Sequence, residues 1–310
     1  MRVEITFADG DVTSLVAKLP AEDAASRQTA VLMGLYAKEV AFYRELAPEI
    51  DVRVPRLFAA ECAPDGSEFI LLLEDLGPAQ QGDQIAGCSL DNARHAIEQA
   101  AALHASSWNA DFALNHPLLQ RRPDLSAQLT ALYPQAQAVF LDRYADDLTA
   151  SERATCEDVA RLFGAMHARE PADRCLIHGD FRLDNMLFAI HGGDEPIAVL
   201  DWQTAALGSP GVDLGYFMGC GIGALGLEND NELLEDYVRF MNERGVALDR
   251  TSLETEYRIG ILTGVATAVF SAAFVERTPR GDANFLSMAR GACALAEARD
   301  AVRILEDNLC

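Results

Sequence analysis

Residues 176–187 read LIHGDFRLDNML. The apolar residues at both ends predict two short buried strands, and the polar residues between them predict a loop. Within this loop, Asp180 and Asn185 place a carboxylate and an amide five residues apart. A carboxylate can orient a hydroxyl group and accept its proton, and an amide oxygen is a hard ligand for Mg²⁺. The spacing matches the H-x-D-x-x-x-x-N pattern that serves phosphoryl transfer, so an ordinary polar turn explains it less well.

A second motif, IAVLD at residues 197–201, brings Asp201 to the end of an apolar strand. A carboxylate at that point can reach a metal ion that bridges two phosphate groups. We therefore predict that Asn185 and Asp201 bind Mg²⁺ and that Asp180 orients the acceptor hydroxyl. Arg182 lies two residues after Asp180 and is a candidate for neutralising charge in the transition state, although a surface arginine explains it equally well.

Together, HGDFRLDNMLF (residues 178–188) and AVLDWQTAALGSPGVDLGYFM (residues 198–218) resemble the motifs of aminoglycoside phosphotransferases and choline kinases. The branch similar to ecdysteroid kinases is the nearest in pattern. The resemblance covers nearly the whole chain. It implies an α+β fold of the protein-kinase type, with a small β-rich lobe followed by a larger, mainly helical lobe.

The resemblance also implies roles for single residues. Asp180 corresponds to the catalytic aspartate, and Asn185 and Asp201 correspond to the magnesium ligands. His178 and Asp213 correspond to residues that brace the catalytic loop. Asp213 also suits the start of a helix, so we expect its role to be structural.

The pattern of elements agrees with two lobes. Alternating apolar residues predict strands at 3–7 and 12–19, joined by a turn at residues 8–11. The turn APDGS at residues 63–67, between 56–62 and 68–73, predicts a second hairpin. A helical spacing predicts one helix from Thr29 to Ala47, which Pro48 ends. We expect residues 1–75 to form the nucleotide-binding lobe. Residues 76–310 then form the helical lobe with the catalytic loop and the acceptor site. In this second lobe, helices are expected at about 91–109, 127–147, 151–170, 232–244, 253–276 and 284–307, and buried strands at 175–177, 186–190 and 196–200.

Lys18 shares its strand face with Val12, Ser14 and Val16, so a buried position there requires an anionic partner. The resemblance supplies two such partners, the phosphates of ATP and a glutamate. Glu39 is the candidate glutamate because it lies within the apolar stripe of the predicted helix. A simple surface ion pair is the alternative.

The connection at Glu74 and Leu76 resembles the hinge of kinase folds, whose backbone groups hold adenine. The start of the sequence departs from the family pattern. Kinase folds carry a glycine-rich loop between their first two strands, whereas this sequence begins in what corresponds to the second strand. Either upstream residues supply the loop, or the chain binds nucleotide without it and is a weak or inactive pseudokinase.

The chain of 310 residues has a formal net charge of −23 and is half apolar. This charge argues against nucleic acid or an anionic membrane as a partner, because both would be repelled. It favours a cationic acceptor slightly, although a negative surface that only maintains solubility is the simpler explanation.

Seven scattered cysteines without a C-x-x-C pair and an N-terminus without a signal peptide predict a cytoplasmic protein. The uncharged run at residues 259–275 is predicted to be a buried helix.

Three other readings are less favoured. The letters G-x-G-x-x-G at residues 221–226 follow a predicted helix and not a strand, which argues against a nicotinamide site. The chain has no A-P-E motif after Asp201, which argues against a protein kinase. Trp108, Trp202 and Tyr216 could cage a quaternary ammonium group, but such aromatics usually fill core space. The sequence thus predicts ATP-dependent phosphorylation of a hydroxyl on a small molecule, with a pseudokinase as the alternative.

Overall fold

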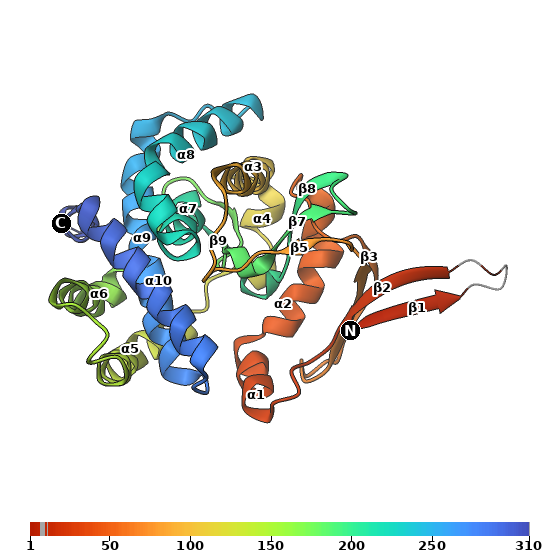
Figure 1. Ribbon diagram of the computed structural model, residues 1–310, viewed down its shortest axis with the longest axis horizontal. Coiled ribbons are helices and arrows are strands. Elements are labelled where there is room, and N and C mark those ends of the chain that lie inside the picture. Colours follow the sequence, from red (N-terminus) through yellow and green to blue (C-terminus); the bar gives the residue numbers. More distant parts are fainter. Residues whose placement is uncertain (7–9, 11, 310) are drawn as a thin grey trace.

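The computed structural model describes residues 1–6, 10 and 12–309. The chain begins with a four-stranded antiparallel sheet in the order β1-β2-β4-β3. Its hairpin β1–β2 projects from the body of the molecule (Figure 1). The predicted turn at residues 8–11 falls largely outside the described residues. The four strands are β1 (Arg2–Thr6), β2 (Val12–Lys18), β3 (Leu57–Cys62) and β4 (Phe69–Glu74).

The helix expected at residues 29–47 is not one regular helix. It begins earlier, as α1 (Ala24–Met33), and α2 (Leu35–Ala41) continues it after a break at Gly34. Gly34 has φ of 71°, a left-handed conformation that glycine adopts without steric cost. A π-helical turn, η1 (Phe42–Leu46), and a short 3₁₀ turn, η2 (Ala47–Glu49), then continue the segment. Pro48 lies within η2, so the segment ends one residue later than expected.

The rest of the chain is mainly helical, and most of the expected helices are present. Two predictions of extent were wrong. The helix expected at 232–244 begins at Gly223, and the one expected at 284–307 is divided at Asp300, whose φ is 51°. The helices are α3 (Leu90–Ser106), α4 (Asp111–Leu114), α5 (Pro123–Arg143), α6 (Ala150–Ala168), α7 (Pro210–Tyr216), α8 (Gly223–Glu243), α9 (Arg250–Phe274), α10 (Pro279–Ala298) and α11 (Ala301–Asp307), with short turns η3 (Pro117–Leu119), η4 (Leu183–Asn185), η5 (Trp202–Thr204) and η6 (Phe217–Gly221).

Two small sheets interrupt the helices. The three strands expected here are present as β6 (Cys175–Ile177), β7 (Met186–Ile190) and β8 (Glu195–Val199). Two more, β5 (Gln80–Gln81) and β9 (Ala206–Gly208), are too short to give a readable alternation. The sheet orders are β5-β7-β8 and β6-β9.

Helix α9 lies at the centre of the helical lobe (Figure 1). By length and composition it is apolar enough to cross a membrane, and 61% of its most apolar window is buried inside the protein. It packs against α5, α6, α7, α10 and α11. This agrees with the buried helix predicted for residues 259–275. One cluster of buried hydrophobic residues extends from the N-terminal sheet into this lobe. Because the two lobes share this cluster, it does not mark where one lobe ends, and the lobe boundary at residue 75 remains a prediction.

Helices α7 and α9 approach each other through glycines. A Cβ atom added at Gly260 would lie 1.8 Å from the carbonyl oxygen of Gly211, and one added at Gly215 would lie 2.3 Å from the backbone nitrogen of Ile261. Only hydrogen at these positions allows the two backbones to come so close. The position of α7 therefore depends on small residues in both helices.

We predict that Gly260→Ala lowers the free energy of unfolding by about 3 kcal/mol or more, because the methyl group meets backbone that cannot rotate away. Urea denaturation followed by circular dichroism measures the change. Gly164→Ala in α6 is the control. Its Cβ would meet only the Thr130 methyl group, at 3.1 Å, and alanine favours the helix. Equal stability of the two variants would contradict the glycine contact as the reason for this packing.

Candidate functional site

The loop at residues 178–185 joins β6 to β7 and is fixed by its own histidine. The His178 ring is fully buried and lies with Nε2 2.8 Å from the carbonyl oxygen of Leu200. Its Nδ1 accepts a hydrogen bond of 3.2 Å from the backbone N–H of Asp180. These contacts fit a neutral ring that donates from Nε2 and accepts at Nδ1. His178 thus ties the loop to the end of β8.

Asp213 holds the same loop from the other side. Its carboxylate is fully buried and accepts hydrogen bonds from the backbone N–H groups of His178, at 2.7 Å, and Gly179, at 2.9 Å. His104 Nε2 lies 3.2 Å from the same carboxylate, and Tyr237 contacts the other ring nitrogen. Burial would raise the pKa of Asp213, but the contacts with His104 and His178 outweigh it and hold the pKa below its ordinary value.

Asp180 meets three donors. Arg182 Nε lies 3.0 Å from Oδ1, the Tyr216 hydroxyl donates to Oδ1 at 2.7 Å, and Asn185 Nδ2 donates to Oδ2 at 2.9 Å. Arg182 also donates to Asp184 at 3.0 Å. Sequence reasoning did not assign Tyr216 to this site. Burial, together with Asp180, raises the pKa of Tyr216 well above its ordinary value, so the hydroxyl stays protonated and donates.

Lys18, Glu39 and Asp201 meet where the N-terminal sheet faces the helical lobe. Lys18 Nζ lies 2.7 Å from Glu39 Oε1 and 3.0 Å from Asp201 Oδ1. Burial would lower the pKa of Lys18, but the two carboxylates outweigh it and raise the pKa. Burial is also the main reason that the pKa of Glu39 is raised, against the effect of Lys18. The predicted Lys18–Glu39 pair is therefore present, and Asp201 is a third member.

The donor set around Asp201 and Asn185 suits a hard cation. Asp201 has φ of 64° at the end of β8, and its side chain is 33% exposed. Because Asn185 Nδ2 is engaged by Asp180, the amide oxygen is free to face elsewhere, and among the described residues no donor contacts it. Carboxylate and amide oxygens are ligands that Mg²⁺ accepts. The described part of the chain has no group of three or more His, Cys, Asp or Glu residues suited to a metal, so the remaining ligands would come from phosphate and water.

The predicted hinge is braced by side chains. The Glu74 carboxylate accepts hydrogen bonds from Arg53, at 3.0 Å, and from the backbone N–H of Arg56, at 3.0 Å, and it lies 3.2 Å from His191 Nε2. The Leu76 carbonyl accepts from the backbone N–H of His191 at 3.0 Å. The backbone N–H of Glu74 donates to the Arg56 carbonyl at 2.9 Å, so a contact of Glu74 with adenine would use its carbonyl, and Leu76 would offer its N–H.

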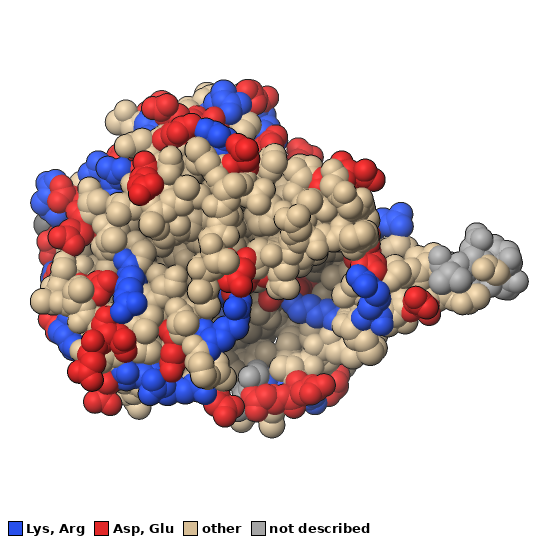
Figure 2. Space-filling view, viewed as in Figure 1, with Lys and Arg blue, Asp and Glu red and all other residues tan. Residues whose placement is uncertain are grey.

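Figure 2 shows that the molecule is hollowed between the sheet and the helical lobe, with Lys and Arg side chains on the walls of the hollow. A cavity of about 170 Å³ adjoins Asp180 and Arg182. The three aromatic residues considered for an ammonium cage do not assemble there. Trp202 is fully buried and stacks on Phe42 with ring centroids 4.0 Å apart. Of the three, Tyr216 alone lines this cavity.

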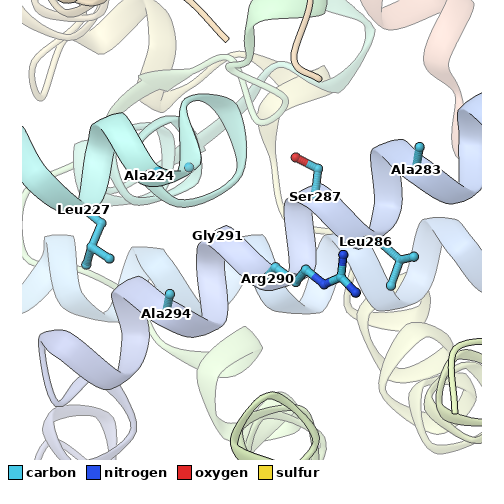
Figure 3. Close-up of a pocket in the computed structure, with 9 residues that line it drawn as sticks. Ala224, Leu227, Ala283, Leu286, Ser287, Arg290, Gly291 and Ala294 are labelled. Carbon is cyan, nitrogen blue, oxygen red and sulfur yellow. The ribbon is translucent and has the colours of Figure 1, made fainter. Parts of the chain in front are cut away.

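A larger hollow of about 610 Å³ lies between the start of α8 and α10, as shown in Figure 3. Its lining is mostly alanine, glycine and leucine. Ser287 and Arg290 are its polar members, and Arg290 already donates to the carbonyl oxygen of Asp147 at 2.6 Å. The lining includes Gly223, within the letters G-x-G-x-x-G. As predicted, a helix precedes these letters, because α7 and the π-helical turn η6 lead into them. We therefore place the candidate site at the smaller cavity beside Asp180.

Comparison with known proteins agrees with this geometry. Residues 6–248 match the sequence model of the phosphotransferase enzyme family. A Ralstonia eutropha structure described as an aminoglycoside phosphotransferase superposes with a TM-score of 0.54 at 16% identity, covering 96% of this chain and 93% of that one. A choline/ethanolamine kinase family protein from Mesorhizobium loti gives 0.51 at 16% identity, over 94% and 89%. ADP-bound aminoglycoside phosphotransferase APH(2'')-Ib gives 0.50 at 13% identity, over 96% and 94%. These similarities confirm the protein-kinase-like α+β fold.

Two curated mouse proteins match a short stretch of the chain. Acyl-CoA dehydrogenase family member 10 of Mus musculus is 43% identical over 51 residues, which is 16% of this chain and 5% of that protein. Family member 11 is 46% identical over 46 residues, which is 14% of this chain and 6% of that protein. The chain therefore aligns with only a small part of these much longer relatives.

We predict that Asp213→Asn lowers the free energy of unfolding by about 3–5 kcal/mol near neutral pH, because it removes a buried charge that two backbone N–H groups share. Since the pKa of Asp213 is lower in the folded state, its contribution is complete above the unfolded pKa of about 3.9 and is lost as pH falls through the lower folded value. The stability gap between wild type and variant should thus narrow below about pH 4.

Urea denaturation at neutral and acidic pH measures this gap. Asp158→Asn is the matched control, because Asp158 lies on the surface and pairs with Arg161. It should change stability by less than about 1 kcal/mol. A gap for Asp213→Asn that persists unchanged into acid would show that the carboxylate charge does not stabilise the loop.

Proposed function

Because the chain belongs to the phosphotransferase enzyme family, we propose that it transfers the γ-phosphate of ATP to a hydroxyl group of a small molecule. The observation that carries this proposal is the contact of Lys18 with both Glu39 and Asp201, which joins the two lobes at one end of the loop that holds Asp180. A lysine held by a buried glutamate is the arrangement that kinases use for the phosphates of ATP. The ADP bound by one structural relative is consistent with a nucleotide here.

In the proposed reaction, Asp180 orients the acceptor hydroxyl and receives its proton. The acceptor oxygen forms a bond to the γ-phosphorus while the bond from that phosphorus to the bridging oxygen breaks, and ADP leaves. Lys18, oriented by Glu39, holds the α and β phosphates. Arg182 stabilises the negative charge on the transferred group.

The proposed cofactor is Mg²⁺, held by Asn185 and Asp201, and it would neutralise phosphate charge when bound. Adenine would lie against the backbone of Glu74 and Leu76. His178 and Asp213 would act on the reaction by positioning other residues, since they contact the loop backbone before Asp180, and His178 also contacts the carbonyl of Leu200 before Asp201. A catalytically inactive protein that still binds nucleotide is the alternative that the experiments below distinguish.

We predict that ATP with Mg²⁺ raises the melting temperature of the wild type and that Asp201→Ala removes this rise. At a ligand concentration 100 times the dissociation constant, binding adds about 2.7 kcal/mol to stability, which corresponds to several degrees for a chain of this size. Asp307→Ala, at an exposed position on α11, is the control and should retain the rise. If the rise persists in Asp201→Ala or does not need Mg²⁺, the metal role of Asp201 is wrong. No rise in the wild type would reject ATP.

We predict that Asp180→Asn lowers phosphate transfer by about 10²–10⁴-fold and leaves nucleotide binding intact, because the amide can accept a hydrogen bond but not a proton. ADP release in the presence of pooled hydroxylated metabolites measures transfer, and the melting shift with ATP and Mg²⁺ measures binding. Normal transfer by Asp180→Asn would contradict the catalytic assignment. A wild type that binds nucleotide but transfers no faster than Asp180→Asn would favour the inactive alternative.

A further inference from the structure

The cavity beside Asp180 combines neutral polar groups with few charges. It is formed where the loop at residues 178–185 meets α7, α9 and α10. Its volume of about 170 Å³ is small, so the cavity would hold only an acceptor smaller than a drug-sized ligand. The lining residues are Gly179, Asp180, Arg182, Thr204, Tyr216, Thr267, Ser271, Asn284, Phe285 and Met288.

The two charged residues that line this cavity neutralise each other, although Arg182 is shared with a second carboxylate, Asp184. Asp180 and Arg182 are its charged lining residues, and they pair with each other at 3.0 Å. Asp184, close by, pairs with Arg182 at 3.0 Å, and Asp83 pairs with Arg280 at 3.4 Å. In the described part of the chain, no carboxylate that lines the cavity lacks an arginine partner. An ammonium group would therefore lose its water without gaining a counter-ion, and it would lie near Arg182.

The neutral groups, in contrast, offer hydrogen-bond acceptors. Asn284 Oδ1 is buried and has no hydrogen-bond partner within the described residues. The hydroxyl of Thr204 donates to the His178 carbonyl at 2.9 Å, and that of Thr267 donates to the Thr263 carbonyl at 2.8 Å. Their oxygens can still accept. A buried polar atom without a partner is costly, so Asn284 Oδ1 calls for a donor such as a hydroxyl on a bound molecule.

We propose that the acceptor is an uncharged polyol with at least two hydroxyl groups and no amine. One hydroxyl lies at Asp180 and receives the phosphate, and a second donates to Asn284 Oδ1. This inference rests on the proposed phosphotransferase function and narrows it. The formal charge of −23 favours a cationic acceptor slightly, but it belongs to the whole surface. The cavity itself carries no net negative charge to attract one.

Matched pairs of acceptors test the proposal. Glycerol is compared with 3-amino-1,2-propanediol, and glucose with glucosamine, because each pair differs by one hydroxyl and one amine. The wild type should phosphorylate the uncharged member of at least one pair, with kcat/KM at least tenfold higher than for its amine. A wild type that prefers the amines, or treats both members alike, overturns the inference while the phosphotransferase function stands.

The variant Asn284→Asp tests the same inference from the side of the protein, since it places a carboxylate where the amide group with the unpartnered oxygen now lies. It should lower kcat/KM for the uncharged member and raise the relative rate of the amine by at least tenfold. Asn308→Asp adds the same charge at an exposed position on the last turn of the chain, and it should leave the preference unchanged. An unchanged preference in Asn284→Asp also overturns the inference, provided that its melting temperature shows a folded protein.

The two proposals can fail separately, because nucleotide binding is measured without any acceptor. If ATP with Mg²⁺ stabilises the wild type but no polyol is phosphorylated, the acceptor class is wrong and the nucleotide site stands. If ATP does not stabilise the protein and no acceptor is phosphorylated, the phosphotransferase function fails, and the acceptor inference fails with it.

Discussion

The buried carboxylate of Asp213 is the contact on which the geometry of the candidate site depends. A charge without solvent is stable only when several donors share it, and here two backbone N–H groups of the loop and a buried histidine do so. Because these donors include the backbone of His178 and Gly179, the loop is fixed at the two residues directly before Asp180. Asp213 in turn is carried by α7, and α7 lies against α9 through glycine contacts at Gly211 and Gly260. The long apolar helix at the centre of the lobe therefore supports the polar loop at its edge.

The two lobes meet through a second set of contacts, both polar and apolar. Glu39 is 1% exposed, and such a carboxylate requires Lys18. Lys18 also reaches Asp201, which lies 183 residues further along the chain. Trp202, the residue after Asp201, stacks on Phe42, so the ion pairs and the aromatic contact join the same two segments. The nucleotide site that we propose is thus assembled by packing between the lobes before any ligand binds.

The sequence predicts some elements and contacts of this structure and not others, and each difference has a physical reason. The apolar run at 69–74 that follows a turn, and the helical spacing in 91–109, are local signals, and both elements were predicted correctly. The break at Gly34 and the division at Asp300 depend on single residues with positive φ, which an apolar pattern does not record. Lys18 and Glu39 could be paired because two buried charges on apolar faces need each other. Tyr216 and His104 were missed as partners of Asp180 and Asp213, because their contacts span 36 and 109 residues and arise only from packing.

The environment of Asp180 bears on how the proposed transfer would work. Three donors hold its carboxylate, and one of them is the cation Arg182. These donors hold the carboxylate in one orientation. Phosphoryl transfer depends mainly on positioning because its transition state is loose, so a carboxylate fixed in this way suits the proposed role. Because Arg182 pairs with Asp180, the feature that would suit Asp180 to orient a hydroxyl would, under our proposal, also make the neighbouring cavity poor for amines. In this view, acceptor preference and the catalytic arrangement have one common origin, the pairing of Asp180 with Arg182.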